Sequence, residues 1–102
     1  MTSLSAAEAR VLLDNRHVSA VELTDAYLDR IRNVEDDVRA FIEVTPEVAR
    51  GQAAVADSRI ARGDAAPLTG IPVALKDVLC TVDAPTTAGS RLLKGYRSPY
   101  DA

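Results

Sequence analysis

Lys76 is the residue whose chemistry most needs an explanation, because it lies inside an apolar run over residues 71–79. Burial disfavours the charged form of a lysine, so an amine inside such a run can lose its proton and act as a base. The alternative is a lysine at the end of a strand, with its aliphatic stem on the sheet and its ammonium in solvent. The residues around Lys76 leave both interpretations open.

Asp77 follows Lys76 directly, and neighbouring side chains of a strand point to opposite faces. We therefore expect Asp77 to bond backbone groups rather than to pair with Lys76. Residues 86–90 (Thr-Thr-Ala-Gly-Ser) supply hydroxyl and N–H groups that can line a site, although loops of this composition are mostly structural. Ser90 is accordingly a weak candidate for a catalytic residue.

His17 and Cys80 are the remaining side chains with reactive or metal-binding chemistry. No second His, Cys or acidic cluster stands at ligand spacing from His17, so we expect a surface loop residue and no metal site. Cys80 has no partner for an internal disulfide and no nearby His, which favours a small packing residue over a nucleophile.

Three helices are predicted ahead of these residues. Residues 5–8 (Ser-Ala-Ala-Glu) and 19–22 (Ser-Ala-Val-Glu) both fit the capping box that begins a helix. The second helix carries an apolar stripe at helical spacing, made of Ala20, Leu23, Tyr27, Ile31 and Val34. Thr45-Pro46 begins a third helix that runs to Arg62 and stops at Gly63, with a small-residue face at Ala49, Ala53, Ala56 and Ile60.

Two segments are predicted to be strands. Residues 39–44 contain aromatic and β-branched side chains and stop at Thr45-Pro46. The nearly continuous apolar run over residues 71–79 is typical of a strand buried on both faces in the centre of an α/β sheet. Lys76 and Asp77 would then lie on a central strand.

The composition is that of a globular protein, with 102 residues, 47% hydrophobic and 26% charged. Its apolar part is weak for an independent core, since 17 residues are Ala, one is Phe and none is Trp. Residues 98–102 resemble the approach to a helix N-terminus, with Asp101 as the cap. We therefore expect residues 1–102 to be the N-terminal portion of a single, incomplete domain that packs loosely or aggregates by itself.

Charge and hydropathy exclude several classes of function. The net charge is −3 and the pI is near 5.0, with basic residues spread along the chain, which argues against direct nucleic-acid binding. No apolar run approaches the ~20 residues that span a bilayer, and the first residues lack the pattern of a secretory signal. We expect no membrane contact and a cytoplasmic location.

The segment over residues 70–77, Gly-Ile-Pro-Val-Ala-Leu-Lys-Asp, resembles the motif of the amidase signature hydrolases. The resemblance covers nearly the whole chain, through residues 19–24, 27–31, 40–42, 67–70, 86–90 and 99–102. Residues 80–81, 86–90 and 99–102 are most similar to the glutaminase subunits of tRNA-dependent amidotransferases. The fold that this resemblance implies is α/β, a mixed central sheet flanked by helices, of which the chain supplies two or three helices and the first strands.

The resemblance implies that Lys76 is the base of a Ser, cis-Ser, Lys triad. The neutral amine would take a proton through a bridging serine from the nucleophilic serine, which attacks the amide carbonyl and forms an acyl-enzyme. Both serines of the family lie beyond residue 102, so residues 1–102 alone are expected to be inactive. The family also has a basic residue and Gly where this chain has Val82 and Asp83, and Asp tolerates a left-handed turn better than most residues.

The resemblance also implies a cellular role. The whole protein would hydrolyse glutamine and pass ammonia to subunits B and C of a heterotrimer, which convert Glu-tRNA(Gln) to Gln-tRNA(Gln). It further implies that no cofactor binds this chain, that ATP and Mg are used by the partner subunit, and that charged tRNA is met through the complex. Two alternatives stay open, namely a stand-alone amidase acting on small amides and a non-catalytic, truncated homologue that serves as a helical interaction module.

Overall fold

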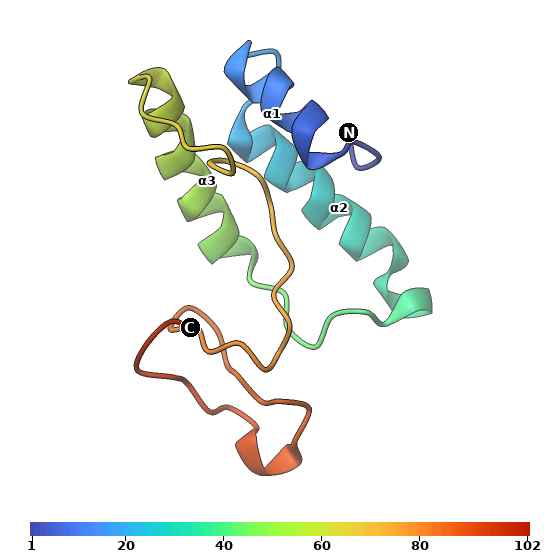
Figure 1. Cartoon of the computed structure of the whole chain (residues 1–102). Helices are drawn as coiled ribbons and strands as arrows, with labels where there is room; N and C mark the ends of the chain where they lie inside the picture. The colour runs from blue at the N-terminus through green and yellow to red at the C-terminus, as the bar shows by residue number, and fades with distance from the viewer. The chain divides into compact units, whose positions relative to one another are not determined.

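The computed structural model describes residues 1–102 and contains three α-helices and one short 3-10 helix (Figure 1). The helices are α1 (Ala6–Asp14), α2 (Ala20–Val38), α3 (Pro46–Ala61) and η1 (Arg91–Leu93). The chain divides into two compact units. The helical unit comprises Met1–Arg39 and Pro46–Pro72, and the C-terminal unit comprises Ala40–Thr45 and Val73–Ala102.

Both predicted capping boxes form. The Ser5 hydroxyl accepts from the Glu8 N–H at 3.2 Å, and the Glu8 carboxylate accepts from the Ser5 N–H at 2.7 Å. Ser19 and Glu22 repeat the arrangement at the start of α2, at 3.0 and 2.8 Å. The Ser5 backbone N–H, followed by the Ser5 hydroxyl, holds the pKa of Glu8 below its ordinary value. These boxes fix where α1 and α2 begin.

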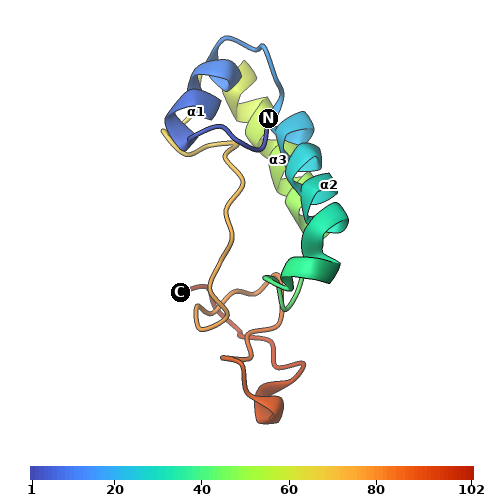
Figure 2. The ribbon, with the colours of Figure 1, turned by 90° about the vertical axis from the view of Figure 1, so that its right-hand side faces the viewer.

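A carboxylate of α3 also caps the start of α2. Asp57 of α3 accepts hydrogen bonds from the Ala20 N–H at 2.7 Å and from the Val21 N–H at 3.2 Å. Together with the Ser19 hydroxyl on Glu22, this satisfies the first three N–H groups of α2, which no intrahelical carbonyl can reach. Asp57 therefore joins α3 to the start of α2, and α2 lies alongside α3 in two perpendicular views (Figures 1 and 2).

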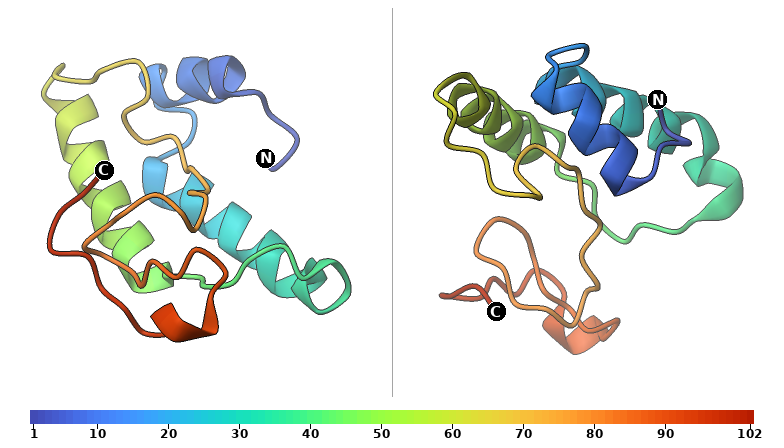
Figure 3. Two further views of the ribbon diagram at one scale, coloured as in Figure 1. Left: turned by 60° about the horizontal axis from the view of Figure 1, so that its bottom comes forward. Right: turned by 45° about the horizontal axis from the view of Figure 1, so that its top comes forward.

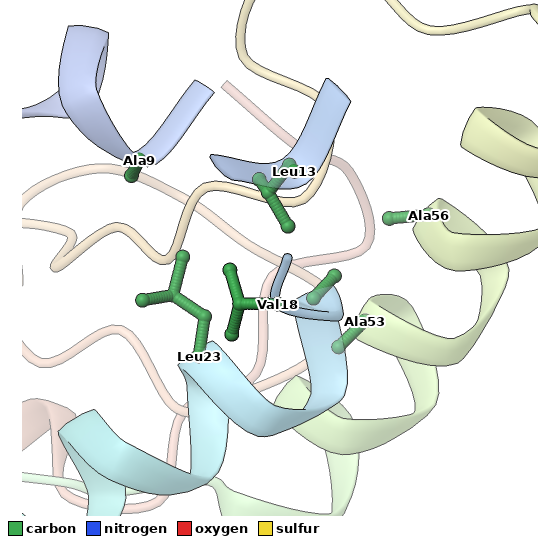
Figure 4. Close-up of a cluster of buried hydrophobic side chains, with 7 residues drawn as sticks. Ala9, Leu13, Val18, Leu23, Ala53 and Ala56 are labelled. Atoms are coloured by element: carbon green, nitrogen blue, oxygen red, sulfur yellow. The ribbon is translucent and has the colours of Figure 1, made fainter. Parts of the chain in front are cut away.

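The core of the helical unit is small and rich in alanine, as the composition predicts. Its buried members come from all three helices and the turn before α2, namely Ala9, Leu13, Val18, Ala20, Leu23, Ala53 and Ala56. Leu13, Val18 and Leu23 gather beside the Ala53 and Ala56 methyl groups of α3 (Figure 4). Of the predicted small-residue face of α3, Ala53 and Ala56 are buried and Ile60 packs against the core at partial burial, whereas Ala49 lies outside the buried cluster.

The predicted apolar stripe of α2 is correct at its start and incomplete further along. Ala20 and Leu23 are buried, whereas Tyr27, Ile31 and Val34 are half-buried. Thr24 and Leu28 are buried as well, so the packed face is wider than the stripe and is centred nearer the N-terminal half of α2.

Residues 62–72 leave α3 and return past α1, as two further views show (Figure 3). The Arg10 guanidinium of α1 donates to the Thr69 carbonyl and, at 3.4 Å, to the Ala66 carbonyl. Arg10 also donates from Nε to Asp14 at 3.0 Å, and its Nη2 forms an ion pair with the same carboxylate at 2.7 Å without a well-aligned hydrogen bond. The return segment is thus fastened to the first helix.

Gly70 ends this segment in a conformation that favours glycine, with φ at +85°. A Cβ atom at this position would lie 3.1 Å from the Ala20 Cβ, 3.3 Å from Leu13 and 3.4 Å from Ile60. One residue from each helix therefore borders Gly70, and the backbone can enter this junction only without a side chain.

The predicted strand over residues 39–44 is wrong. Arg39 is the C-cap of α2 and adopts the left-handed conformation, with φ at 50°, because the helix continues as far as Val38. Residues 40–45 are irregular. The end of α3 agrees with the prediction to within a residue. Gly63 adopts φ of 72° and the Asp64 N–H donates to the Arg59 carbonyl at 2.9 Å, which ends the helix.

The predicted buried strand over residues 71–79 is also wrong for this chain. Residues 71–76 are irregular and residues 77–79 turn, and the side chains of Val73 and Leu75 are 81% and 62% exposed. A strand is stabilised by hydrogen bonds to a neighbouring strand, and no segment of residues 1–102 forms one. Of the predicted α/β fold, the structure shows the helical start and no sheet.

None of the helices is both long enough and apolar enough to cross a membrane.

Candidate functional site

Lys76 lies in the C-terminal unit with its side chain exposed and without a hydrogen bond or ion pair. Its carbonyl accepts from the Leu79 N–H at 3.0 Å, which closes a turn directly after it. The strand that would bury Lys76 does not form within residues 1–102, so the apolar segment around it has no sheet to cover it. The side chain is exposed, as in the second interpretation, but the strand end and sheet of that interpretation are absent too.

Asp77 is the best-connected side chain of this unit, and it bonds backbone groups as predicted. One carboxylate oxygen accepts from the Thr87 N–H at 2.8 Å. The other accepts from the Thr87 hydroxyl and, at 3.2 Å, from the Gly89 N–H. The Asp77 carbonyl accepts from the Ala88 N–H at 2.9 Å. Three successive amides therefore converge on this one residue.

These bonds favour the ionised carboxylate. The Thr87 hydroxyl, followed by the Thr87 N–H, holds the pKa of Asp77 below its ordinary value, and the Gly89 N–H acts in the same direction. Ala88 and Gly89 both adopt left-handed conformations, with φ at 50° and 71°. A turn of that kind directs successive N–H groups into one concave surface suited to an anion, here occupied by Asp77.

The rest of the Thr86–Ser90 segment is structural. Thr86 is buried, and its N–H donates to the Tyr96 carbonyl at 2.9 Å. The Ser90 hydroxyl accepts from the Leu92 N–H at 3.2 Å and caps η1. His17 is exposed in the turn before α2, as expected.

A shallow hollow of about 280 Å³ lies beside Cys80, which is half-buried. Asp101 lines it and accepts from the Val82 N–H at 2.9 Å, where the sequence predicted a helix cap. The Ala102 N–H donates to the Cys80 carbonyl at 2.8 Å, so residues 101–102 lie along residues 80–82. Asp83 does not adopt the left-handed conformation, and the exchange of Gly for Asp therefore needs no special turn here.

The sequence model of the family described as Amidase matches residues 22–102, which include most of α2, all of α3 and the whole Lys76 region. The chain belongs to the amidase family. The motif over residues 70–77 lies inside the matched region, and α1 precedes it.

Curated relatives of this amidase chain share about half of its residues. It is 50% identical over 96 residues to the A-type subunit of the glutamyl-tRNA(Gln) amidotransferase of Methylococcus capsulatus, and the match covers 94% of the chain. It is 47% and 50% identical over all 102 residues to the subunits of the same name from Dehalococcoides mccartyi and Aromatoleum aromaticum. The chain spans about a fifth of the length of these relatives, 20–21%.

Proposed function

We propose that the full-length protein containing this amidase chain is the glutaminase subunit of a tRNA-dependent amidotransferase. It hydrolyses glutamine and supplies ammonia for the conversion of Glu-tRNA(Gln) to Gln-tRNA(Gln). The observation that carries the proposal is identity of 47–50% to A-type subunits of glutamyl-tRNA(Gln) amidotransferases over the whole chain or nearly all of it. The motif that ends in Lys76 and Asp77 falls within that stretch.

In this proposal Lys76 is the base of the Ser, cis-Ser, Lys triad, and the two serines come from sequence outside residues 1–102. Its neutral amine takes the proton of the nucleophilic serine through the bridging serine, while the serine oxygen bonds to the amide carbon of glutamine. The same proton returns to the leaving nitrogen, so ammonia departs and a glutamyl ester remains. Water then hydrolyses the ester and regenerates the serine. The exposed, unpaired amine of Lys76 is compatible with this role, because other parts of the full protein can still pack over it.

The partners follow from the same proposal. Subunits B and C complete the heterotrimer in the cytoplasm, and charged tRNA is bound through the complex. ATP and Mg are used by the partner subunit that activates the glutamyl group. In residues 1–102, no three His, Cys, Asp or Glu side chains gather where they could hold a metal ion.

The test is ammonia release from glutamine by the full-length protein, with and without its partner subunits. Lys76→Ala should lower kcat by about 10³-fold or more, the scale of a general base that also belongs to a triad. The chain holds one other lysine, Lys94, whose backbone N–H donates to the Arg91 carbonyl at the end of η1. Lys94→Ala is the matched control and should keep kcat within about twofold, because it removes a lysine side chain to which the proposal gives no chemical role.

Near-normal glutamine hydrolysis by Lys76→Ala would overturn the catalytic assignment. Hydrolysis of small amides with no response to subunits B and C would favour the stand-alone amidase instead. A full-length frame that encodes no downstream serine pair would favour the non-catalytic homologue.

A further inference from the structure

The Asp77 carboxylate accepts several hydrogen bonds from a segment farther along the chain. Its two oxygens receive three donors, from the Thr87 N–H, the Thr87 hydroxyl and the Gly89 N–H. The residues joined lie ten and twelve positions apart in the chain. Asp77 therefore closes a loop of about that length, and the closure depends on a side chain that only accepts hydrogen bonds.

The backbone on both sides of the Lys76–Asp77 peptide is held at the same time. The Lys76 carbonyl accepts from Leu79, and the Asp77 carbonyl accepts from Ala88. The Lys76 amine, in contrast, has no partner within residues 1–102. The backbone at Lys76 and Asp77 is thus held by hydrogen bonds while the Lys76 amine is free. Asp77 takes part in most of the bonds that hold this backbone.

We propose that Asp77 is a positioning residue for Lys76. By holding residues 87–89 with its carboxylate, Asp77 sets the backbone direction from which the Lys76 amine reaches the bridging serine. Asp77 is half-buried and bonded to residues 87–89 while the Lys76 side chain is exposed, so Asp77 can anchor the segment and leave Lys76 free to face the substrate. This inference rests on the proposed function, and it adds a residue that touches neither glutamine nor the serines.

A carboxylate suits this position better than any neutral side chain. Asparagine presents one acceptor oxygen and an NH₂ group, so it can accept from Thr87 but would set its NH₂ against the Gly89 N–H. Alanine presents neither. The three side chains should therefore rank Asp, Asn, Ala in their ability to hold residues 87–89.

The experiment compares Asp77→Asn and Asp77→Ala with wild type in the full-length protein with its partner subunits. Misplacing a catalytic group by about 1 Å can cost about 10²-fold in rate, so Asp77→Ala should lower kcat by about 10²-fold, with Asp77→Asn between. The KM for glutamine should stay within about twofold, because no contact with glutamine is removed. Thr87→Ser keeps all the donors and should keep kcat, whereas Thr87→Val loses the hydroxyl and should give an intermediate kcat.

Asp101→Asn is the control, since Asp101 accepts a single N–H, from Val82, which an asparagine oxygen can also accept. Thermal unfolding accompanies each assay, and a variant counts only when its Tm matches wild type. Where Asp77→Ala does not fold, Asp77→Asn and Thr87→Val decide.

Unchanged kcat in the folded Asp77 variants, with Lys76→Ala inactive, would overturn the positioning role and leave the proposed function intact. A raised KM with unchanged kcat would also overturn it, because Asp77 would then act in binding. Full activity of Lys76→Ala would instead refute the proposed function itself.

Discussion

Replacing Asp57 with alanine tests whether one side chain of α3 sets the start of α2. The change removes the acceptor of the Ala20 and Val21 N–H groups, at 2.7 and 3.2 Å. Ala20 is fully buried, so its N–H loses its partner in a place that water reaches poorly. A buried donor left without a partner costs about 1–3 kcal/mol, and a lost cap costs about 1 kcal/mol.

The gain in helix propensity partly offsets this loss. Alanine inside a helix is better than aspartate by up to about 0.7 kcal/mol, so the net destabilisation should be about 1–3 kcal/mol. For a chain of about this size, that lowers Tm by about 5–25 °C. Thermal and urea unfolding followed by far-UV circular dichroism measure both quantities.

Two companion variants sharpen the result. Asp57→Asn keeps one acceptor oxygen and should lose less than Asp57→Ala. Ser58→Ala changes the neighbouring residue, which is exposed and bonds the Ala54 carbonyl within its own helix at 3.2 Å. It should alter stability by less than about 0.5 kcal/mol. If Asp57→Ala is no less stable than Ser58→Ala, the cross-helix cap is not a stabilising contact and the reasoning is refuted.

Three further outcomes are expected. Gly70→Ala should lower the stability of the helical unit by at least about 1 kcal/mol, because its φ is +85° and a Cβ would lie 3.1 Å from Ala20; unfolding curves that match wild type would contradict this. The hydrogen bonds of the Asp77 carboxylate should be present at pH values above 3.8, the ordinary pKa of an aspartate, and should be lost as pH falls through the lower pKa of the folded state. The Thr87 and Gly89 amide resonances should therefore titrate below pH 3.8. Hydrogen exchange should protect the amides of α2 and α3 and leave residues 73–76 fast, since these residues form no ladder; protection across them would reveal a strand.

Local signals in the sequence predicted the helices well. Each capping box depends on residues three apart, and the end of α3 depends on one glycine, so both can be found without knowing the tertiary structure. The small-residue face of α3 was predicted from residue spacing within one helix, which is also a local signal. The expectation that Asp77 bonds backbone groups is confirmed, but its premise, a strand through residues 76–77, is wrong because Asp77 lies in a turn.

Features that depend on partners far apart in the sequence were either not predicted or predicted wrongly. The segment over residues 71–79 has the composition of a buried strand, but burial requires neighbours that residues 1–102 do not form. The cap by Asp57 joins residues 36 and 37 positions apart, and no short motif reports such a bond. One signal was available: Asp57 lies four residues after Ala53, beside the small-residue face, where an acidic side chain needs a partner.

The bonds of Arg10 have a practical consequence for how a shortened protein should be made. The match to the amidase family begins at residue 22, which invites an expression boundary just before α2. Such a boundary would delete the guanidinium that holds the Ala66 and Thr69 carbonyls, together with Leu13 of the core. Any trimmed version should therefore start ahead of Ser5, so that the first helix keeps both its cap and its hold on the segment that leads to Lys76.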